Sequence, residues 1–212
     1  LAHTHGMQLA LHAIGDAAIE AGIDAVERAI TESPREHRHR MIHAQITNHE
    51  LLRRMAELGM LADVQPVFVS SDWNLVESRI GKERAGSSYA WKSMLNEGIP
   101  MAAGTDAPVE ELNPMYGIYA AVTRKDLQGQ PKNGWLPKQK LTVYEAVELY
   151  TKGGAYATFE EKEKGTLSEG KLADMAILSE DPFEAEPDDI KDIEVLTTIL
   201  GGELVYTSLP GM

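Results

Sequence analysis

Short apolar runs alternate with helical segments along the N-terminal half of the chain, and this alternation restricts the fold more than any other feature. The runs have the length of buried strands and lie at residues 7–12, 40–44, 60–64 and 99–104. The clearest helix starts near Asp16, a possible N-cap, and Ser33-Pro34 ends it. Its apolar stripe consists of Ile19, Ile23, Val26 and Ile30. Strands separated by helices form a parallel sheet with covering helices, so the sequence predicts an α/β fold.

Polar residues mark the ends of further helices. Thr47 and Glu50 have the spacing of a capping box, and Gly59 can end the helix that follows. Thr142 and Glu145 have the same spacing and predict another capped helix. Two more helices are expected at residues 89–96 and 114–123, with a loop at 125–140.

Residues 65–88 form a long polar stretch in which we find no clear strand or helix pattern. A structureless connection of this length is usually functional. We therefore expect an active-site loop here. Gln65 and Trp73 in this stretch, together with Tyr116 further along, are expected to line the substrate pocket.

The C-terminal part of the chain has a different residue pattern. From about Thr158, glycines punctuate three short apolar runs, which lie at 175–178, 195–200 and 204–206. An acidic segment at 180–192 separates the first two runs and is expected to be a solvated surface turn. This pattern predicts a β appendage over residues 159–212, distinct from the α/β unit at 1–158.

Charge and cysteine content exclude several kinds of function. The chain of 212 residues has 20 Lys and Arg against 33 Asp and Glu, a net charge of −13, which disfavours nucleic acid and anionic membranes as partners. It has no cysteine, so thiolate metal ligands and cysteine nucleophiles are excluded. No apolar run approaches the roughly 20 residues of a membrane span. We expect a cytoplasmic protein that acts on a small molecule.

Three residues that can bind metal lie at the ends of predicted strands. His12, His43 and Asp106 each stand at or just past the C-terminal end of a run. Parallel strands bring such ends to one rim, where ligands bind in α/β folds. Imidazole and carboxylate ligands suit Zn²⁺ best, with Fe²⁺, Mn²⁺ and Ni²⁺ also possible. The alternative is that each histidine only satisfies local hydrogen bonds.

The remaining histidines carry weaker signals. His3 and His5 precede Gly6 and are expected to close a helical turn rather than to form a metal pair. His37 and His39 lie in a charged connector and are expected to be solvated.

Several segments together resemble the metal-dependent amidohydrolase superfamily, in the branch related to N-substituted formamide deformylases. The resemblance covers nearly the whole chain and is most specific in its last two segments. The segments read LALHAIGDAAI, MIHAQ, DVQP, GTDAPVEELNPMYGIYAAVTRKD and GTLSEGKLADMAILSEDP followed by TILGGELVY. The resemblance implies a (β/α)₈ barrel with a small β-sandwich. Residues 1–158 would then be strands five to eight of that barrel, and 159–212 would be part of the sandwich.

The resemblance also implies roles for individual residues. His12 and His43 would be the metal ligands of strands five and six, and Asp106 would be both a ligand and the general base. The reaction implied is hydrolysis of an amide-like C–N bond, not a peptide bond, by metal-activated water. The family's HxH pair and its bridging carboxylate or carboxylated lysine have no counterpart in this chain, which starts at Leu1 and looks like a piece of something longer. We therefore expect the isolated chain to be inactive.

Half a barrel has two unpaired sheet edges, which favours a homo-oligomer. Two other functions stay open at this point. One is a non-catalytic α/β fragment or binding module without metal. The other is a phosphoryl or glycosyl enzyme that uses Glu110 and Glu111, which we instead expect to be solvated charges.

Overall fold

The computed structural model describes residues 1–210, which form two sheets. The larger sheet is parallel, with strand order β1-β2-β3-β4, and its strands are β1 (Ala10–Ala13), β2 (Arg40–His43), β3 (Leu61–Val64) and β4 (Met101–Ala103). All four lie within or close to the runs identified in the sequence. The α/β prediction is confirmed.

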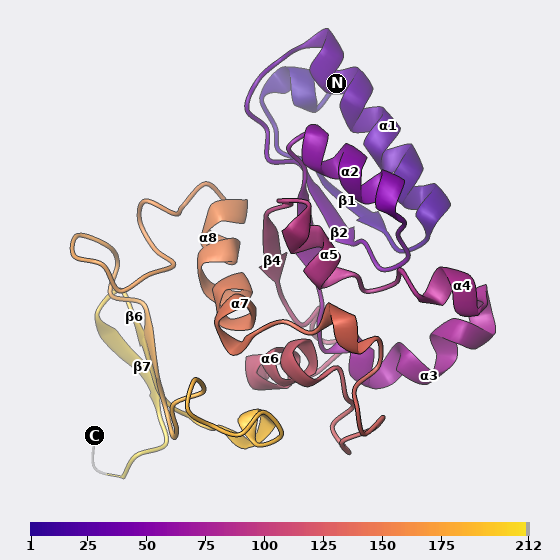
Figure 1. The fold of residues 1–212 in the computed structure, drawn as a ribbon. Coiled ribbons are helices and arrows are strands. Elements are labelled where there is room, and N and C mark those ends of the chain that lie inside the picture. The colour runs from indigo at the N-terminus through magenta and orange to yellow at the C-terminus, as the bar shows by residue number, and fades with distance from the viewer. Residues whose placement is uncertain (211–212) are drawn as a thin grey trace.

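Helices pack around this sheet, with those over its face and those beside β4 both visible in Figure 1. They are α1 (Asp16–Glu32), α2 (His49–Glu57), α3 (Phe68–Ile80), α4 (Lys82–Ala85), α5 (Trp91–Asn96), α6 (Pro114–Thr123), α7 (Val143–Glu148) and α8 (Gly154–Ala157). A π-helical turn, η3 (Leu149–Gly153), joins α7 to α8. None of the helices in the described residues is long and apolar enough to cross a membrane.

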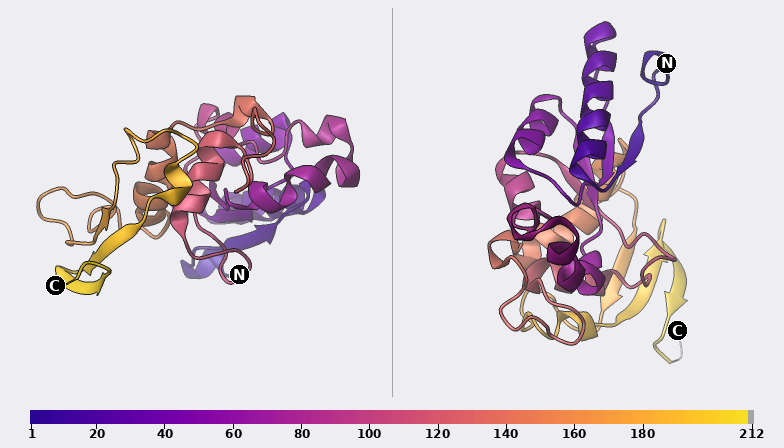
Figure 2. Two further views of the ribbon diagram at one scale, coloured as in Figure 1. Left: turned by 90° about the horizontal axis from the view of Figure 1, so that it is seen from below. Right: turned by 90° about the vertical axis from the view of Figure 1, so that its right-hand side faces the viewer.

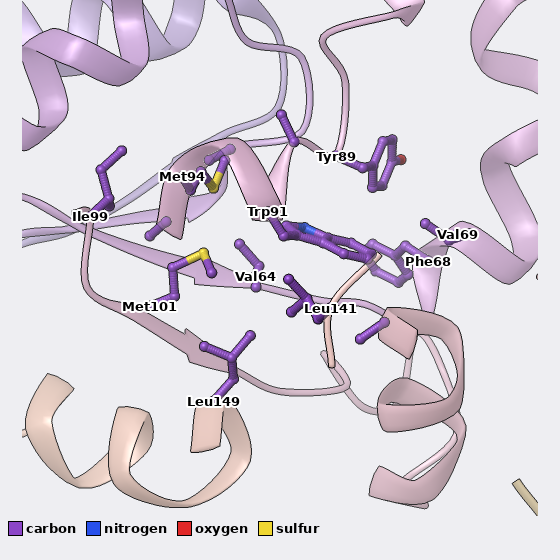
Figure 3. Packing of buried hydrophobic residues seen from close by; sticks show 14 of the residues in the cluster. Val64, Phe68, Val69, Tyr89, Trp91, Met94, Ile99, Met101, Leu141 and Leu149 are labelled. Carbon is purple, nitrogen blue, oxygen red and sulfur yellow. The ribbon is translucent and has the colours of Figure 1, made fainter. Parts of the chain in front are cut away.

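The two faces of the parallel sheet differ because side chains alternate along a strand. Met41, Ala62 and Val64 face the helices and are completely buried in the main core. Figure 3 shows Trp91 and Met94 of α5 near Val64 in this core. The opposite face carries Arg40 and Asp63, which alternate with these core residues along β2 and β3. The first face is therefore apolar, and the second, which we call the polar face, also buries Leu61 and Ala102 in a small cluster with Ala157.

The expectation of a loop at residues 65–88 is wrong, because most of this stretch is helical. α3 buries Phe68, Val69 and Val76, and the short α4 follows directly after Gly81. Val69, Trp73, Val76 and Ile80 have the spacing of a helical apolar stripe, but the polar residues between them made the stretch read as a loop. Ser70, Ser71 and Ser78 all lie within α3.

The expectation that His37 and His39 are solvated is also wrong. His37 is 7% exposed and His39 is completely buried, and both lie next to the buried ring of His3. His39 donates through Nε2 to Nδ1 of His3 at 2.8 Å and accepts from the backbone N–H of Leu9 at 3.0 Å. His37 accepts from the backbone N–H of His39 at 3.0 Å. Charged residues flank His37 and His39 in the sequence, and for this reason the sequence predicted solvent exposure instead of a buried cluster.

The turn that contains His3 is η1 (His3–His5), a 3₁₀ turn that ends at Gly6 in a left-handed conformation. The expected closing turn is therefore present. The rings of His3 and His37 donate to backbone carbonyls, those of Ser33 and Leu58. Every ring nitrogen of the three buried histidines has a partner, so the cluster needs no ligand.

The structure confirms the cap predicted for α7 but has other capping residues than predicted at α1 and α2. Thr142 and Glu145 form the expected capping box of α7. For α2 the capping residue is Asn48, whose side chain accepts from the N–H of Leu51, while Thr47 instead donates to the carbonyl of Ser87. For α1 the N-cap is Gly15, and Asp16 is the first helical residue. Gly59 follows the end of α2 with a positive φ of 64°, as expected.

One edge of the parallel sheet is covered. β4 bonds to β3 through the carbonyl of Pro100 and the N–H of Gly104, so the carbonyl of Met101 points to the other side. That carbonyl meets Gly153 of η3, where an added Cβ would lie only 2.2 Å from the Met101 oxygen. The helical segment thus shields the β4 edge, a common protection for edge strands. Of the two unpaired edges expected, that of β1 pairs with no further strand within residues 1–210.

The three C-terminal strands predicted from the sequence form a separate antiparallel sheet with order β5-β6-β7. They are β5 (Met175–Leu178), β6 (Val195–Leu200) and β7 (Glu203–Thr207). Figure 2 places this sheet at the end of the molecule far from α1. The acidic segment before β6 is anchored rather than fully solvated, because η4 (Ile190–Asp192) packs on α6 with Ile190 completely buried.

Candidate functional site

Two of the three predicted metal ligands meet at the C-terminal rim of the parallel sheet. His12 lies in β1 and His43 ends the neighbouring β2, so adjacent strands carry the two side chains. Their rings contact edge to face, with the ring centroids 4.6 Å apart. His43 is buried to 6% exposure, whereas His12 is exposed to solvent. The structure therefore brings these two histidines together as the strand-end argument predicted.

The backbone at His43 is unusual. His43 has a φ of 71° and Ala44 a φ of 47°, both in the left-handed region that non-glycine residues rarely adopt. The N–H of Ala44 donates to the carbonyl of Ala13 at 3.1 Å, and that of Ile46 donates to the carbonyl of Ile14 at 2.9 Å. These bonds tie the turn after β2 to the end of β1. Such strained residues concentrate at functional sites and persist only where their surroundings fix them.

Gln65 fixes the ring of His43. Its Oε1 lies 2.7 Å from Nδ1 of His43, and its own amide donates to the backbone carbonyl of Asp63 at 3.2 Å. Since the amide oxygen can only accept, the Nδ1 of His43 carries the proton and donates it. Nε2 is then left as a lone-pair acceptor, the form in which imidazole binds a metal. The sequence predicted a substrate contact for Gln65 and missed this orienting hydrogen bond.

Asp106 lies on the same rim but is not joined to the histidines. It follows β4 by three residues, is exposed, and has a positive φ of 60°. Its carbonyl accepts from the N–H of Val109 at 2.9 Å, which closes a turn. Within residues 1–210, no three His, Asp or Glu side chains are grouped closely enough to hold a metal ion. The chain by itself thus presents a pair of histidines and a nearby free carboxylate.

Asp63 is an additional acidic residue near the rim that the sequence analysis did not identify. It lies on the polar face of β3, and Nη1 of Arg40 donates to its carboxylate at 3.0 Å. Burial raises the pKa of the Asp63 carboxyl above its usual value, Arg40 and His43 lower it, and the carboxylate of Asp106 raises it further. The sequence did contain a signal for this pair, because the alternation of side chains along a strand puts Arg40 and Asp63 on one face of neighbouring strands.

The other predicted contacts lie apart from the two histidines. Trp73 of α3 donates through Nε1 to the carboxylate of Asp126 at 3.2 Å. Tyr116 of α6 packs against the main core. Their roles in substrate binding stay predictions. Of the acidic pair considered for other chemistry, Glu110 accepts from the hydroxyl of Ser71 at 2.7 Å, and Glu111 is exposed.

Comparison with known proteins agrees with this arrangement. The profile of the amidohydrolase family matches residues 1–206. The amidohydrolase YtcJ of Bacillus subtilis (strain 168) is 41% identical over 206 residues, which are 97% of this chain and 38% of that protein. The N-substituted formamide deformylase of Arthrobacter pascens is 29% identical over 203 residues, 95% of this chain and 37% of that protein.

A solved structure shares the fold. A metal-dependent hydrolase of Pyrococcus furiosus superposes with a TM-score of 0.73 at 34% identity and covers 86% of this chain and 36% of that one. The chain thus spans little more than a third of the length of the proteins it matches. Because the family profile covers nearly all of its residues and the Bacillus protein is 41% identical over 206 of them, the chain belongs to the amidohydrolase family.

Proposed function

We propose that this chain is the C-terminal part of a metal-dependent hydrolase that cleaves amide-like C–N bonds other than peptide bonds. In this proposal its four parallel strands are half of a (β/α)₈ barrel and its three-stranded sheet belongs to a β-sandwich. The family, the hydrolase relatives and the formamide deformylase support it. We also propose a cytoplasmic location and association with a second copy.

The observation that carries the proposal is the pair formed by His12 and His43. Their rings contact at the carboxyl ends of adjacent parallel strands, and Gln65 leaves Nε2 of His43 free to coordinate. A histidine that served only local packing would need neither the left-handed backbone of His43 nor an oriented ring. The pair is therefore best explained as part of a ligand set.

The donor types fit a divalent cation, and Zn²⁺ most closely. Two imidazoles and a carboxylate are a usual zinc ligand set, whereas Fe²⁺, Mn²⁺ and Ni²⁺ accept the same donors. A cation bound there would polarise the amide carbonyl and make water a stronger acid. His12 and His43 would hold it, with Asp106 as the third ligand. The matched relatives are far longer than this chain, and in this proposal their remaining length supplies further ligands.

Asp106 is proposed as the general base. An exposed carboxylate on the rim can take a proton from the attacking water at Oδ and pass it to the departing nitrogen. The half-buried Asp63 is unsuited to this step because the guanidinium of Arg40 occupies its carboxylate. Asp63 instead keeps Arg40 in place on the polar face of the sheet.

The experiment is titration of the 212-residue chain with Co²⁺, whose visible absorption reports nitrogen and oxygen ligands, followed by assay of amine release from N-substituted formamides and from dipeptides. We expect a Co²⁺ spectrum that is lost in His12→Ala and no turnover. A wild-type chain without any Co²⁺ band would favour the non-catalytic fragment. Turnover insensitive to chelators would favour the carboxylate pair Glu110 and Glu111, and turnover of dipeptides would contradict the proposed bond class.

A further inference from the structure

Arg124 is a completely buried cation at the end of α6. Its guanidinium carbon lies 4.3 Å from the ring centre of Trp91 and 5.2 Å from that of Trp135. No carboxylate within residues 1–210 forms an ion pair with it, and burial lowers its pKa to about 9. Burying an unpaired charge is costly, so this arginine must be held for the contacts it makes.

Those contacts are two backbone carbonyls from separate segments. Nε donates to the carbonyl of Trp135 and Nη1 to the carbonyl of Tyr89, each at 3.0 Å. Nη2 is buried without a partner. The planar fork of arginine is suited to joining two carbonyls at fixed positions. Arg124 therefore acts as a clamp on the segment that contains Tyr89.

That segment, residues 87–89, runs beside the turn that follows β2, and we call it the strap. The N–H of Tyr89 donates to the carbonyl of Gln45 at 2.7 Å. Ser87 and Thr47 each donate their hydroxyl to the other's carbonyl, at 2.7 and 2.8 Å. Ser88 forms an isolated antiparallel bridge with Ile46. The strap thus fixes the backbone immediately after His43 and Ala44.

A chain of strained residues connects the clamp to the metal-ligand candidate. Arg124 has a φ of 60°, Tyr89 of 50°, Ala44 of 47° and His43 of 71°, all in the left-handed region. Non-glycine residues keep this strained conformation only where their surroundings impose it. The side chain of Arg124 donates to the carbonyl of Tyr89, and the N–H of Tyr89 donates to the carbonyl of Gln45. Gln45 directly follows His43 and Ala44, whose strained backbone sets the direction of the His43 ring.

We propose that Arg124 is a positioning residue for His43. By holding the strap through the carbonyl of Tyr89, it keeps the turn after β2 in the conformation in which the imidazole of His43 meets Gln65 and His12. This proposal rests on the proposed function in one respect, because it is as a metal ligand that His43 needs a fixed orientation. The hydrogen bonds of the Arg124 side chain go to the carbonyls of Trp135 and Tyr89, so its effect on His43 passes through the strap.

The test uses the 212-residue chain and needs no metal. Nitrogen-15 NMR reports which ring nitrogen of His43 carries the proton, and hydrogen exchange of the Tyr89 amide reports the strap. The amide of Ala62 in β3, which donates to the carbonyl of Pro100 in the middle of the sheet, reports global opening for comparison. The variants are Arg124→Met, which removes both donors, and Arg124→Lys, which keeps the charge and one donor. The control is Lys125→Met, because Lys125 pairs with Asp188 away from the strap.

In Arg124→Met we expect the Tyr89 amide to exchange about tenfold faster relative to that of Ala62, and the single His43 tautomer to become a mixture. Arg124→Lys should increase the exchange rate of the Tyr89 amide by less than Arg124→Met does. It is the variant that tests the proposal if Arg124→Met does not fold. Lys125→Met should match the wild type. Unchanged Tyr89 exchange and an unchanged His43 tautomer in the folded Arg124 variants would overturn the proposal. A wild-type chain that fails to bind Zn²⁺ would count against the proposed function and leave this test intact.

Discussion

Nδ1 of His43 lies 2.7 Å from Oε1 of Gln65, and this contact decides which nitrogen of the histidine is free. With the proton on Nδ1, the lone pair on Nε2 is available for coordination. Hydrogen bonds of this kind to a metal-binding histidine set both the tautomer and the orientation of the ring. Metal binding by His43 should therefore depend on Gln65.

Replacement of Gln65 by Leu should weaken Zn²⁺ binding about tenfold to a hundredfold, because His43 loses its acceptor and its fixed tautomer. Gln65→Glu keeps an acceptor oxygen and should bind Zn²⁺ at least as well as the wild type. Isothermal titration calorimetry of the two variants is the measurement. Equal affinities for Gln65→Leu and the wild type would remove the orienting role.

The histidine cluster below the sheet predicts acid sensitivity. Burial lowers the pKa of His37, and burial together with His37 and His3 lowers that of His39 to about 4 from 6.5. The folded state therefore binds fewer protons than the unfolded state between these values, so stability is complete above pH 6.5 and falls as the pH drops toward 4. From His39 alone we expect a loss of about 2 kcal/mol between about pH 7.5 and about pH 5.

Urea denaturation at these two pH values measures that loss. His39→Gln removes the titrating ring and should show a smaller difference between them, although it is less stable at neutral pH. His49→Gln is the control, because His49 is exposed on α2. The same pH dependence in His39→Gln as in the wild type would show that other groups cause it.

Two adjacent glycines should respond in opposite ways to alanine. A Cβ on Gly153 would lie 2.2 Å from the carbonyl of Met101, whereas one on Gly154 would meet nothing within 4 Å. Both residues have helical φ values. We expect Gly153→Ala to cost about 2 kcal/mol by overpacking and Gly154→Ala to stabilise by about 0.5 kcal/mol. Thermal unfolding of both variants tests whether η3 shields the β4 edge, and equal melting temperatures would contradict it.

The edge of β1 predicts self-association. The carbonyls of Leu9 and Ala13 bond to β2 and the residues after it, so the polar backbone groups of Ala10 and His12 point away from the sheet. We expect a dimer or larger assembly by light scattering. Ala10→Pro removes a donor from the open edge only and should shift the assembly toward monomer. A sharp monomer of the wild-type chain at high concentration would rule out this mode of association.

Periodicity was sufficient to predict the strands, α1 and the capping box of α7, because each depends on local apolar spacing or on one side chain beside one backbone group. It also predicted that His12 and His43 meet, since parallel strand ends share a rim. α3 was missed although Val69, Trp73, Val76 and Ile80 have the same spacing as the apolar stripe of α1, because the polar residues between them made the stretch read as a loop.

The features that the sequence could not reveal depend on contacts between distant segments. His37 and His39 are buried by η1 and by strand ends that precede them by about thirty residues, so their charged neighbours gave the wrong expectation. Gln65 reaches His43 across the sheet rim. Arg124 contacts a carbonyl 35 positions away in the sequence. None of these pairs has a local signal.

The central claim is that His12 and His43 hold a divalent cation, and the most direct measurement is the zinc content of the purified chain after dialysis, by plasma mass spectrometry. We expect bound Zn²⁺ in the wild type and in His49→Ala, and its loss in both His12→Ala and His43→Ala. Zinc retained equally in all four proteins, or absent from a wild-type chain that was loaded with excess Zn²⁺ before dialysis, would contradict this claim.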